Sequence, residues 1–144
     1  MKEYVIDCTF CTALIVPESN IANNVRKSPM FVFLDDDILN VPQLWWFEIS
    51  NVLKNLIHKK IFDYTTALEL IPKLSGLNIK TDKECGAEYA ETILRLSIDF
   101  NLSSYNAAYL ELAIRRRACI CTLDESLINA AMCAGLKTTN GRQD

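Results

Sequence analysis

The chain has 144 residues, half of them hydrophobic, with four glycines and four prolines, a composition that indicates one compact domain with a single core. The formal net charge is −3 and the pI about 5.2, which excludes a general basic surface that would wrap DNA. No stretch approaches the roughly 20 apolar residues that cross a bilayer. Glu3 and Asp7 interrupt the apolar run that a signal peptide would need. We therefore expect a single domain over residues 1–144, a cytoplasmic location, no membrane partner and reduced cysteines.

The first third of the chain predicts two short strands and two short helices. Residues 3–7 (EYVID) are rich in Tyr, Val and Ile and predict a buried strand. Helices are predicted over Thr9–Val16 and Ser19–Lys27, and a second strand over Ile38–Val41. Residues 31–34 fit either a helix end or a strand.

From Pro42 onward the pattern is mainly helical, with apolar residues recurring at spacings of three and four. Ser103 is a good N-cap for one of these helices. The expected helices are 42–56, Asp63–Leu74, Gly86–Ile98, 103–113 and Glu125–Cys133, and the expected strands are Ala118–Leu123 and Leu136–Thr138. Strands that alternate with helices predict an α/β fold, a central parallel sheet of short strands flanked by helices on both sides.

Three acidic residues occupy positions that a metal site would use. Asp7 ends the first strand, Asp124 follows a later strand, and Glu48 lies on an otherwise apolar helix face. Each alone fits a helix cap or a solvated side chain. Together they indicate more, because ends of parallel strands converge on one sheet edge, where ligands bind. Clustered carboxylates repel one another unless a cation lies between them, and Mg²⁺ or Mn²⁺ prefers such oxygen ligands.

Four segments in order carry a resemblance to a known family: YVID, VPQLWWFEISNVL, LSSYNAAYLELA and ICTLDESL. They resemble a PIN domain, specifically the VapC-type toxins of bacterial toxin–antitoxin pairs. The resemblance is nearly end to end and strongest over residues 4–16, 38–60 and 102–136. It implies a PIN-like fold and a ribonuclease that binds Mg²⁺ or Mn²⁺ through four acids. It also implies a cognate antitoxin and a homodimer as partners, besides the RNA substrate.

The resemblance assigns roles to particular residues. The first, second and fourth acids of the family fall on Asp7, Glu48 and Asp124. Thr122 stands where the family often has a threonine lining the site. Thr9 matches a position that the family usually fills with a small polar residue.

The third acid position departs from the family, because Asn106 stands where Tyr-Asp-Ala is usual. Asparagine keeps an amide oxygen that can ligate a metal but lacks the negative charge. Three carboxylates still compensate one divalent ion, whereas a second ion becomes doubtful. Two functions therefore stay open: a metal-dependent endoribonuclease toxin, and a catalytically weak or inactive PIN domain that serves as an antitoxin-binding or regulatory partner.

Other features have structural and functional readings. Cys8 and Cys11 form a C-x-x-C pair, which leaves a thiol-redox role as a third hypothesis. Arg115, Arg116 and Arg117 complement the end of a helix or contact RNA phosphates. His58, the single histidine, belongs to no recognisable catalytic triad. The surplus of apolar residues in the first helices and around Trp45 fits core packing, or a groove for an antitoxin segment and a homodimer interface.

Overall fold

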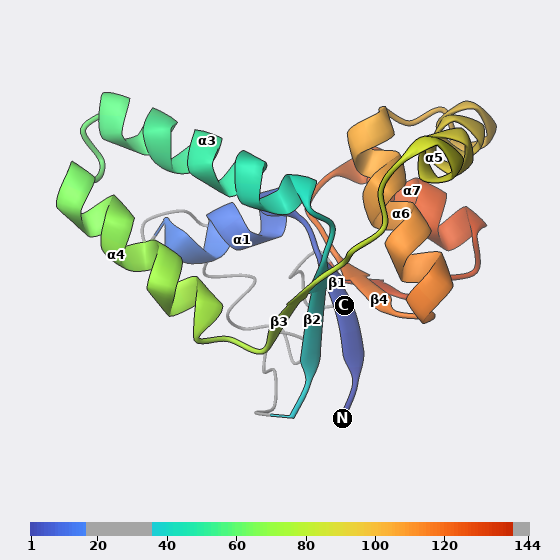
Figure 1. Ribbon diagram of the computed structural model, residues 1–144, viewed down its shortest axis with the longest axis horizontal. Coiled ribbons are helices and arrows are strands. Elements are labelled where there is room, and N and C mark those ends of the chain that lie inside the picture. Colours follow the sequence, from blue (N-terminus) through green and yellow to red (C-terminus); the bar gives the residue numbers. More distant parts are fainter. Residues whose placement is uncertain (17–35, 140–144) are drawn as a thin grey trace.

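The computed structural model describes residues 1–16 and 36–139. Its centre is one sheet of five parallel strands in the order β3-β2-β1-β4-β5 (Figure 1). β1 lies in the middle because its run of Tyr, Val and Ile suits a strand buried on both faces. The strands are β1 Glu3–Ile6, β2 Ile38–Val41, β3 Ile79–Thr81, β4 Cys119–Cys121 and β5 Thr138–Thr139.

Helices flank this sheet on two sides (Figure 1). One group contains α1 Cys8–Ile15, α3 Leu44–His58 and α4 Tyr64–Ser75, and the other contains α5 Ala87–Phe100, α6 Ser104–Arg116 and α7 Glu125–Cys133. The predicted α/β architecture with a parallel sheet between helices is confirmed. None of the helices within residues 1–16 and 36–139 has the length and apolar character required to cross a membrane.

The core lies where α1, α3 and α6 meet the central strands. Val5 and Ile120 on neighbouring strands are fully buried, and Phe10 on α1, Trp45 on α3 and Leu110 on α6 pack into the same cluster. Because α6 has small residues on its buried face, it packs closely against both β1 and α5. This packing fixes the carboxyl ends of β1 and β4 relative to α3 and α6.

The structure differs from the predicted elements at several ends. β3 at 79–81 was not predicted, because it is a three-residue edge strand with two half-buried residues around an exposed one and has no clear apolar pattern. The last strand is Thr138–Thr139 and not Leu136–Thr138, and α3 begins at Leu44, with Pro42 before its first turn. The predictions for 19–27 and 31–34 lie outside the described residues.

Candidate functional site

The candidate site is built around Asp7, the first residue after β1. Asp7 has extended backbone angles and caps α1, its Oδ1 accepting a hydrogen bond of 2.8 Å from the Phe10 N–H. A strand that passes directly into a helix needs such a cap, since the first helical N–H groups have no partner within the helix. Asp7 is nevertheless only 2% exposed, which is rare for a capping carboxylate.

Two threonine hydroxyls connect Asp7 with Asp124. The Thr9 hydroxyl lies 2.8 Å from both Asp7 carboxylate oxygens, and the Thr122 hydroxyl donates to Oδ2. In turn, the backbone N–H groups of Leu123 and Asp124 donate to the Thr9 and Thr122 hydroxyl oxygens, each at 3.0 Å. The two acids at the ends of adjacent strands therefore share one hydrogen-bonded frame, as the strand order requires.

Burial has a large effect on Asp7. The pKa of this carboxyl is raised from 3.8 to about 6, mainly by desolvation and to a smaller extent by the charge of Asp124, against the lowering effect of hydrogen bonds from Thr122, Phe10 and Thr9. Asp124 caps α7 through Oδ1, which accepts from the Leu127 N–H at 3.0 Å. Two carboxylates in a partly desolvated position favour either a bound proton or a cation.

The Glu48 carboxylate is held by a hydrogen bond from α6. It lies in the second turn of α3 and accepts a hydrogen bond of 2.6 Å from the Tyr109 hydroxyl of α6. Tyr109 is 1% exposed, and partial burial raises the pKa of Glu48. Besides burial, the charges of both Glu48 and Asp7 raise the pKa of the Cys8 thiol, so both acids lie near that residue.

The sequence pattern did not single out Tyr109 as a site residue. The detectable signal is its position three residues after Asn106, since residues three apart lie on one face of a helix. Asn106 is the third residue of α6 and half-buried, and its backbone N–H donates to the Ser103 hydroxyl at 3.1 Å. The first turns of α6 therefore carry Asn106 and Tyr109, and the Tyr109 phenol reaches Glu48.

The oxygen atoms of these acids are chemically suited to bind a hard divalent cation. Glu48 and Asp124 each accept hydrogen bonds through one carboxylate oxygen, and no described residue bonds the other. Oxygen ligands of this kind are those that Mg²⁺ and Mn²⁺ use. Within 1–16 and 36–139, no three His, Cys, Asp or Glu side chains lie together as a ligand group.

The C-x-x-C pair lies beside Asp7 but has the wrong properties for thiol chemistry. Cys8 and Cys11 are both buried free thiols. Burial raises the pKa of the Cys8 thiol to about 11 and that of the Cys11 thiol to about 12. Redox-active pairs need the opposite shift, because the thiolate is the reactive form.

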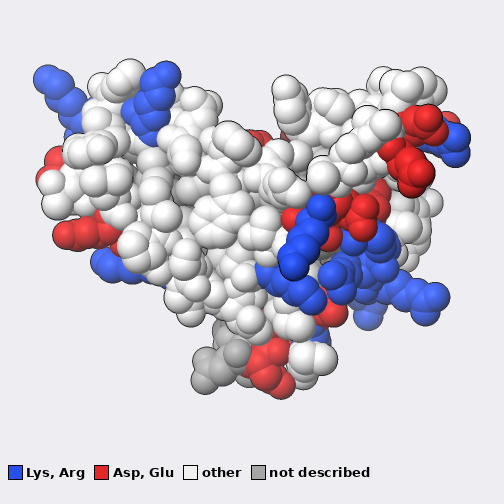
Figure 2. All heavy atoms as spheres, in the orientation of Figure 1, with Lys and Arg blue, Asp and Glu red and all other residues white. Residues whose placement is uncertain are grey.

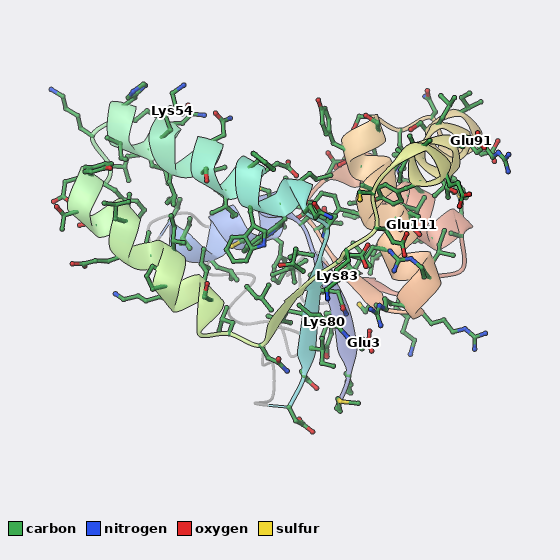
Figure 3. All side chains as sticks on the ribbon, in the orientation of Figure 1. Glu3, Lys54, Lys80, Lys83, Glu91 and Glu111 are labelled. Carbon is green, nitrogen blue, oxygen red and sulfur yellow. The ribbon has the colours of Figure 1, made fainter. Side chains whose placement is uncertain are left out.

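The three arginines at the end of α6 are not part of the acidic site. Arg115 donates to both Asp82 oxygens, at 3.0 and 2.6 Å, and to Glu111 at 2.8 Å. Figure 3 labels Glu111 on α6 and Lys83 in the segment after β3. Arg117 lies just before β4, at the amino edge of the sheet and opposite the acids. An RNA contact by these arginines stays a prediction.

Comparison with known proteins supports the fold. No protein-family model matches the chain, and no curated protein matches it. Among solved structures, the chain is similar to the crystal structure of PAE2754 from Pyrobaculum aerophilum, with a TM-score of 0.66 and 20% sequence identity. The match covers 95% of this chain and 83% of that one. At this identity the likeness extends to the fold.

Proposed function

We propose that this chain is a Mg²⁺- or Mn²⁺-dependent endoribonuclease with a PIN fold, the toxin of a toxin–antitoxin pair. The observation that carries the proposal is the state of Asp7: a 2% exposed carboxyl at the end of the central strand, with a pKa of about 6 and Asp124 nearby. Perturbed carboxyls that cluster at a strand-end edge are typical of functional sites.

Each residue has a distinct task in this proposal. Asp7, Glu48 and Asp124 would hold the ion, with Asn106 contributing a neutral amide oxygen. When bound, the ion would activate water and stabilise charge on the phosphodiester during hydrolysis. Thr9 and Thr122 orient the Asp7 carboxylate through their hydroxyls, and the Tyr109 hydroxyl orients Glu48. Such second-layer hydrogen bonds keep ligands in position for the metal.

The proposed partners follow from the resemblance and from exposed apolar surface. A groove of about 400 Å³ lies between α3 and α4, and its apolar lining residues include Leu53, Ile57, Tyr64, Leu68 and Ile71. Tyr64 and Leu68 are 67% and 48% exposed, more than a helix face packed in a monomer core would leave open. An amphipathic antitoxin segment or a second copy in a homodimer would suit such a groove, and a cytoplasmic location suits such a pair.

A second candidate function is a binding protein without turnover. One observation that favours it is that Asn106 stands where the resemblance implies an acid. The Asp7 carboxylate is also already occupied by hydroxyl donors at both oxygens. In that case the acidic edge would serve to receive a basic antitoxin side chain.

Cleavage of a transfer-RNA pool in the presence of Mn²⁺ separates the two functions. The proteins to compare are the natural chain, Asn106→Asp, Asp7→Asn and Asp63→Asn. The last is the matched control, because Asp63 also caps a helix but lies far from the site on the exposed start of α4. Cleavage that is lost only with Asp7→Asn supports the nuclease. Cleavage by Asn106→Asp alone supports the binding protein, and no cleavage by any of the four removes the nuclease proposal for these substrates.

A further inference from the structure

Two large aromatic side chains are exposed beside the candidate site. Phe47 on α3 is 79% exposed, and Tyr105 on α6 is 65% exposed. Side chains as exposed as these contribute little to the core, so their aromatic faces are available to a ligand. One exposed hydrophobic side chain is ordinary on a protein surface. Two aromatic ones next to the same group of acids require an explanation.

The packing of α3 near α6 brings these two aromatic residues to one region of the molecule. Leu44 in the first turn of α3 packs against the small hydrophobic cluster that contains Ala107 and Ala108 of α6. Phe47 follows Leu44 by three residues, and Tyr105 precedes Ala108 by three. Since residues three apart lie on one face of a helix, each aromatic residue is one helical turn from this packed region.

Both aromatic residues are also close to Glu48 along their helices. Phe47 directly precedes Glu48, and Tyr105 lies four residues before Tyr109, whose hydroxyl donates to Glu48 at 2.6 Å. Residues four apart share a helix face, so Tyr105 lies on the face of α6 that reaches Glu48. Figure 2 shows the upper outline of the molecule notched between α3 and the α5–α6 pair, with Lys and Arg side chains gathered elsewhere on this view, at the upper left and lower right.

General electrostatic attraction for RNA is weak at this edge of the sheet. The chain has a net charge of −3, and Asp7 lies near both Asp124 and Glu48. Arg115 on α6 is already paired with Asp82. Phosphate groups gain affinity mainly from positive side chains. Stacking of unpaired bases on aromatic rings supplies affinity without positive charge and accepts every base, because each base has a π face.

The apolar surface at Phe47 does not continue along α3. Ser50 and Asn51, three and four residues later, are exposed and polar. A helix of a partner protein would need apolar anchors over several turns, whereas a nucleobase needs only one aromatic face. The isolated aromatic ring on each helix therefore favours a nucleobase over a protein segment.

We infer that Phe47 and Tyr105 form a base-stacking subsite that binds unpaired nucleotides of single-stranded RNA beside the acidic edge. Each aromatic ring covers the face of one base, which holds the adjoining sugar–phosphate backbone near the acids. The subsite selects unpaired over paired RNA, because bases within a duplex already stack on one another. This inference rests on the proposed function, since it specifies how that nuclease binds its substrate, but the binding step itself needs no cleavage.

The test measures equilibrium binding of a short single-stranded RNA that carries the fluorescent base 2-aminopurine. Ca²⁺, which also takes oxygen ligands, is the divalent ion, and a gel verifies that the RNA stays intact. The full chain should bind this strand and quench 2-aminopurine, because stacking on an aromatic ring quenches its fluorescence. The same sequence annealed to its complement should bind at least about tenfold more weakly, since its bases are not available for stacking.

Substitutions on the surface assign the binding to the two rings. Phe47→Leu and Tyr105→Leu keep an apolar side chain but remove the aromatic face, so each should raise the Kd for single-stranded RNA about fivefold or more and reduce the quenching. Phe47→Tyr and Tyr105→Phe should bind like the natural chain, because they keep the aromatic face. Tyr64→Leu is the matched control, since Tyr64 is 67% exposed and lines the groove between α3 and α4.

The proposal is overturned if the two leucine variants bind single-stranded RNA as tightly as the natural chain does. It is also overturned if the natural chain binds no RNA or binds the strand and the duplex equally well. If the leucine variants change only the oligomeric state, measured by sedimentation, the aromatic residues belong to a protein interface and not to an RNA subsite.

Failure of the proposed nuclease would give a different result. Binding that depends on Phe47 and Tyr105, without cleavage of the transfer-RNA pool in Mn²⁺, keeps the subsite and removes the enzyme. Cleavage with a KM that neither leucine variant changes keeps the enzyme and removes the subsite.

Discussion

Replacing Asp7 with asparagine should stabilise this protein at neutral pH, even though the change removes a capping carboxylate. Asp7 is 2% exposed, and burial raises its pKa from 3.8 to about 6. A carboxyl whose pKa is higher in the folded state contributes stability below about pH 4, and that contribution is lost as the pH rises through about 6. At about 1.36 kcal/mol per pKa unit, ionised Asp7 costs the folded state about 3 kcal/mol above pH 7.

The asparagine variant does not recover this whole amount. Its amide oxygen can still accept from the Phe10 N–H, but the hydroxyls of Thr9 and Thr122 lose a charged acceptor, at a cost of about 1–2 kcal/mol. We therefore expect Asp7→Asn to be more stable than the natural chain by about 1–2 kcal/mol at pH 8. Near pH 4.5 the variant should be less stable than the natural chain, because Asp7 is then protonated in the folded state and no longer carries a buried charge.

Urea unfolding in metal-free buffer between pH 4.5 and 8, followed by tryptophan fluorescence and circular dichroism, measures this difference. The matched control is Asp63→Asn, since the exposed Asp63 also caps a helix and accepts from the Thr66 N–H at 2.7 Å. That hydrogen bond lowers the pKa of Asp63, so its charge stabilises the fold and the control variant should lose stability above pH 4. If the difference in unfolding free energy between Asp7→Asn and the natural chain stays constant with pH, the reasoning is refuted. It is also refuted if the natural chain becomes the more stable of the two as the pH rises.

Three further predictions concern side chains around the same edge. Tyr109→Phe removes the hydrogen-bond donor to Glu48. It should lower the free energy of unfolding by about 1–2 kcal/mol, measured by urea unfolding, and weaken Mn²⁺ binding, measured by calorimetry. Unchanged Mn²⁺ affinity would exclude a positioning role for the phenol. Thr122→Val removes a hydrogen bond that lowers the Asp7 pKa, so carboxyl NMR titration should show that pKa above 6, and a value at or below 6 would contradict this. The Cys8 thiol, with a pKa of about 11, should react with iodoacetamide at pH 8 at least about tenfold more slowly than the exposed cysteines, because its thiolate fraction is small; a comparable rate would show that the thiol is not buried as described.

Much of the fold follows from local sequence pattern. The apolar run of β1 and the serine before α6 predict those elements nearly at their observed ends. The acids at strand ends were identified because a parallel sheet brings its carboxyl ends together whatever the details of packing. β3 was not identified, since a three-residue edge strand acquires its partner in β2 only after the chain has folded.

The sequence by itself determined the class of fold and which carboxylates share an edge, because strand and helix periods and helix caps depend on neighbouring residues. Only the tertiary structure decided the chemistry of those carboxylates. The pKa of Asp7 depends on desolvation by elements packed from distant parts of the chain, including Thr122. The partnership of Glu48 with Tyr109 joins residues 61 positions apart. Such long-range contacts, and the commitment of Arg115 to Asp82, arise from three-dimensional packing and leave no periodic signal in the sequence.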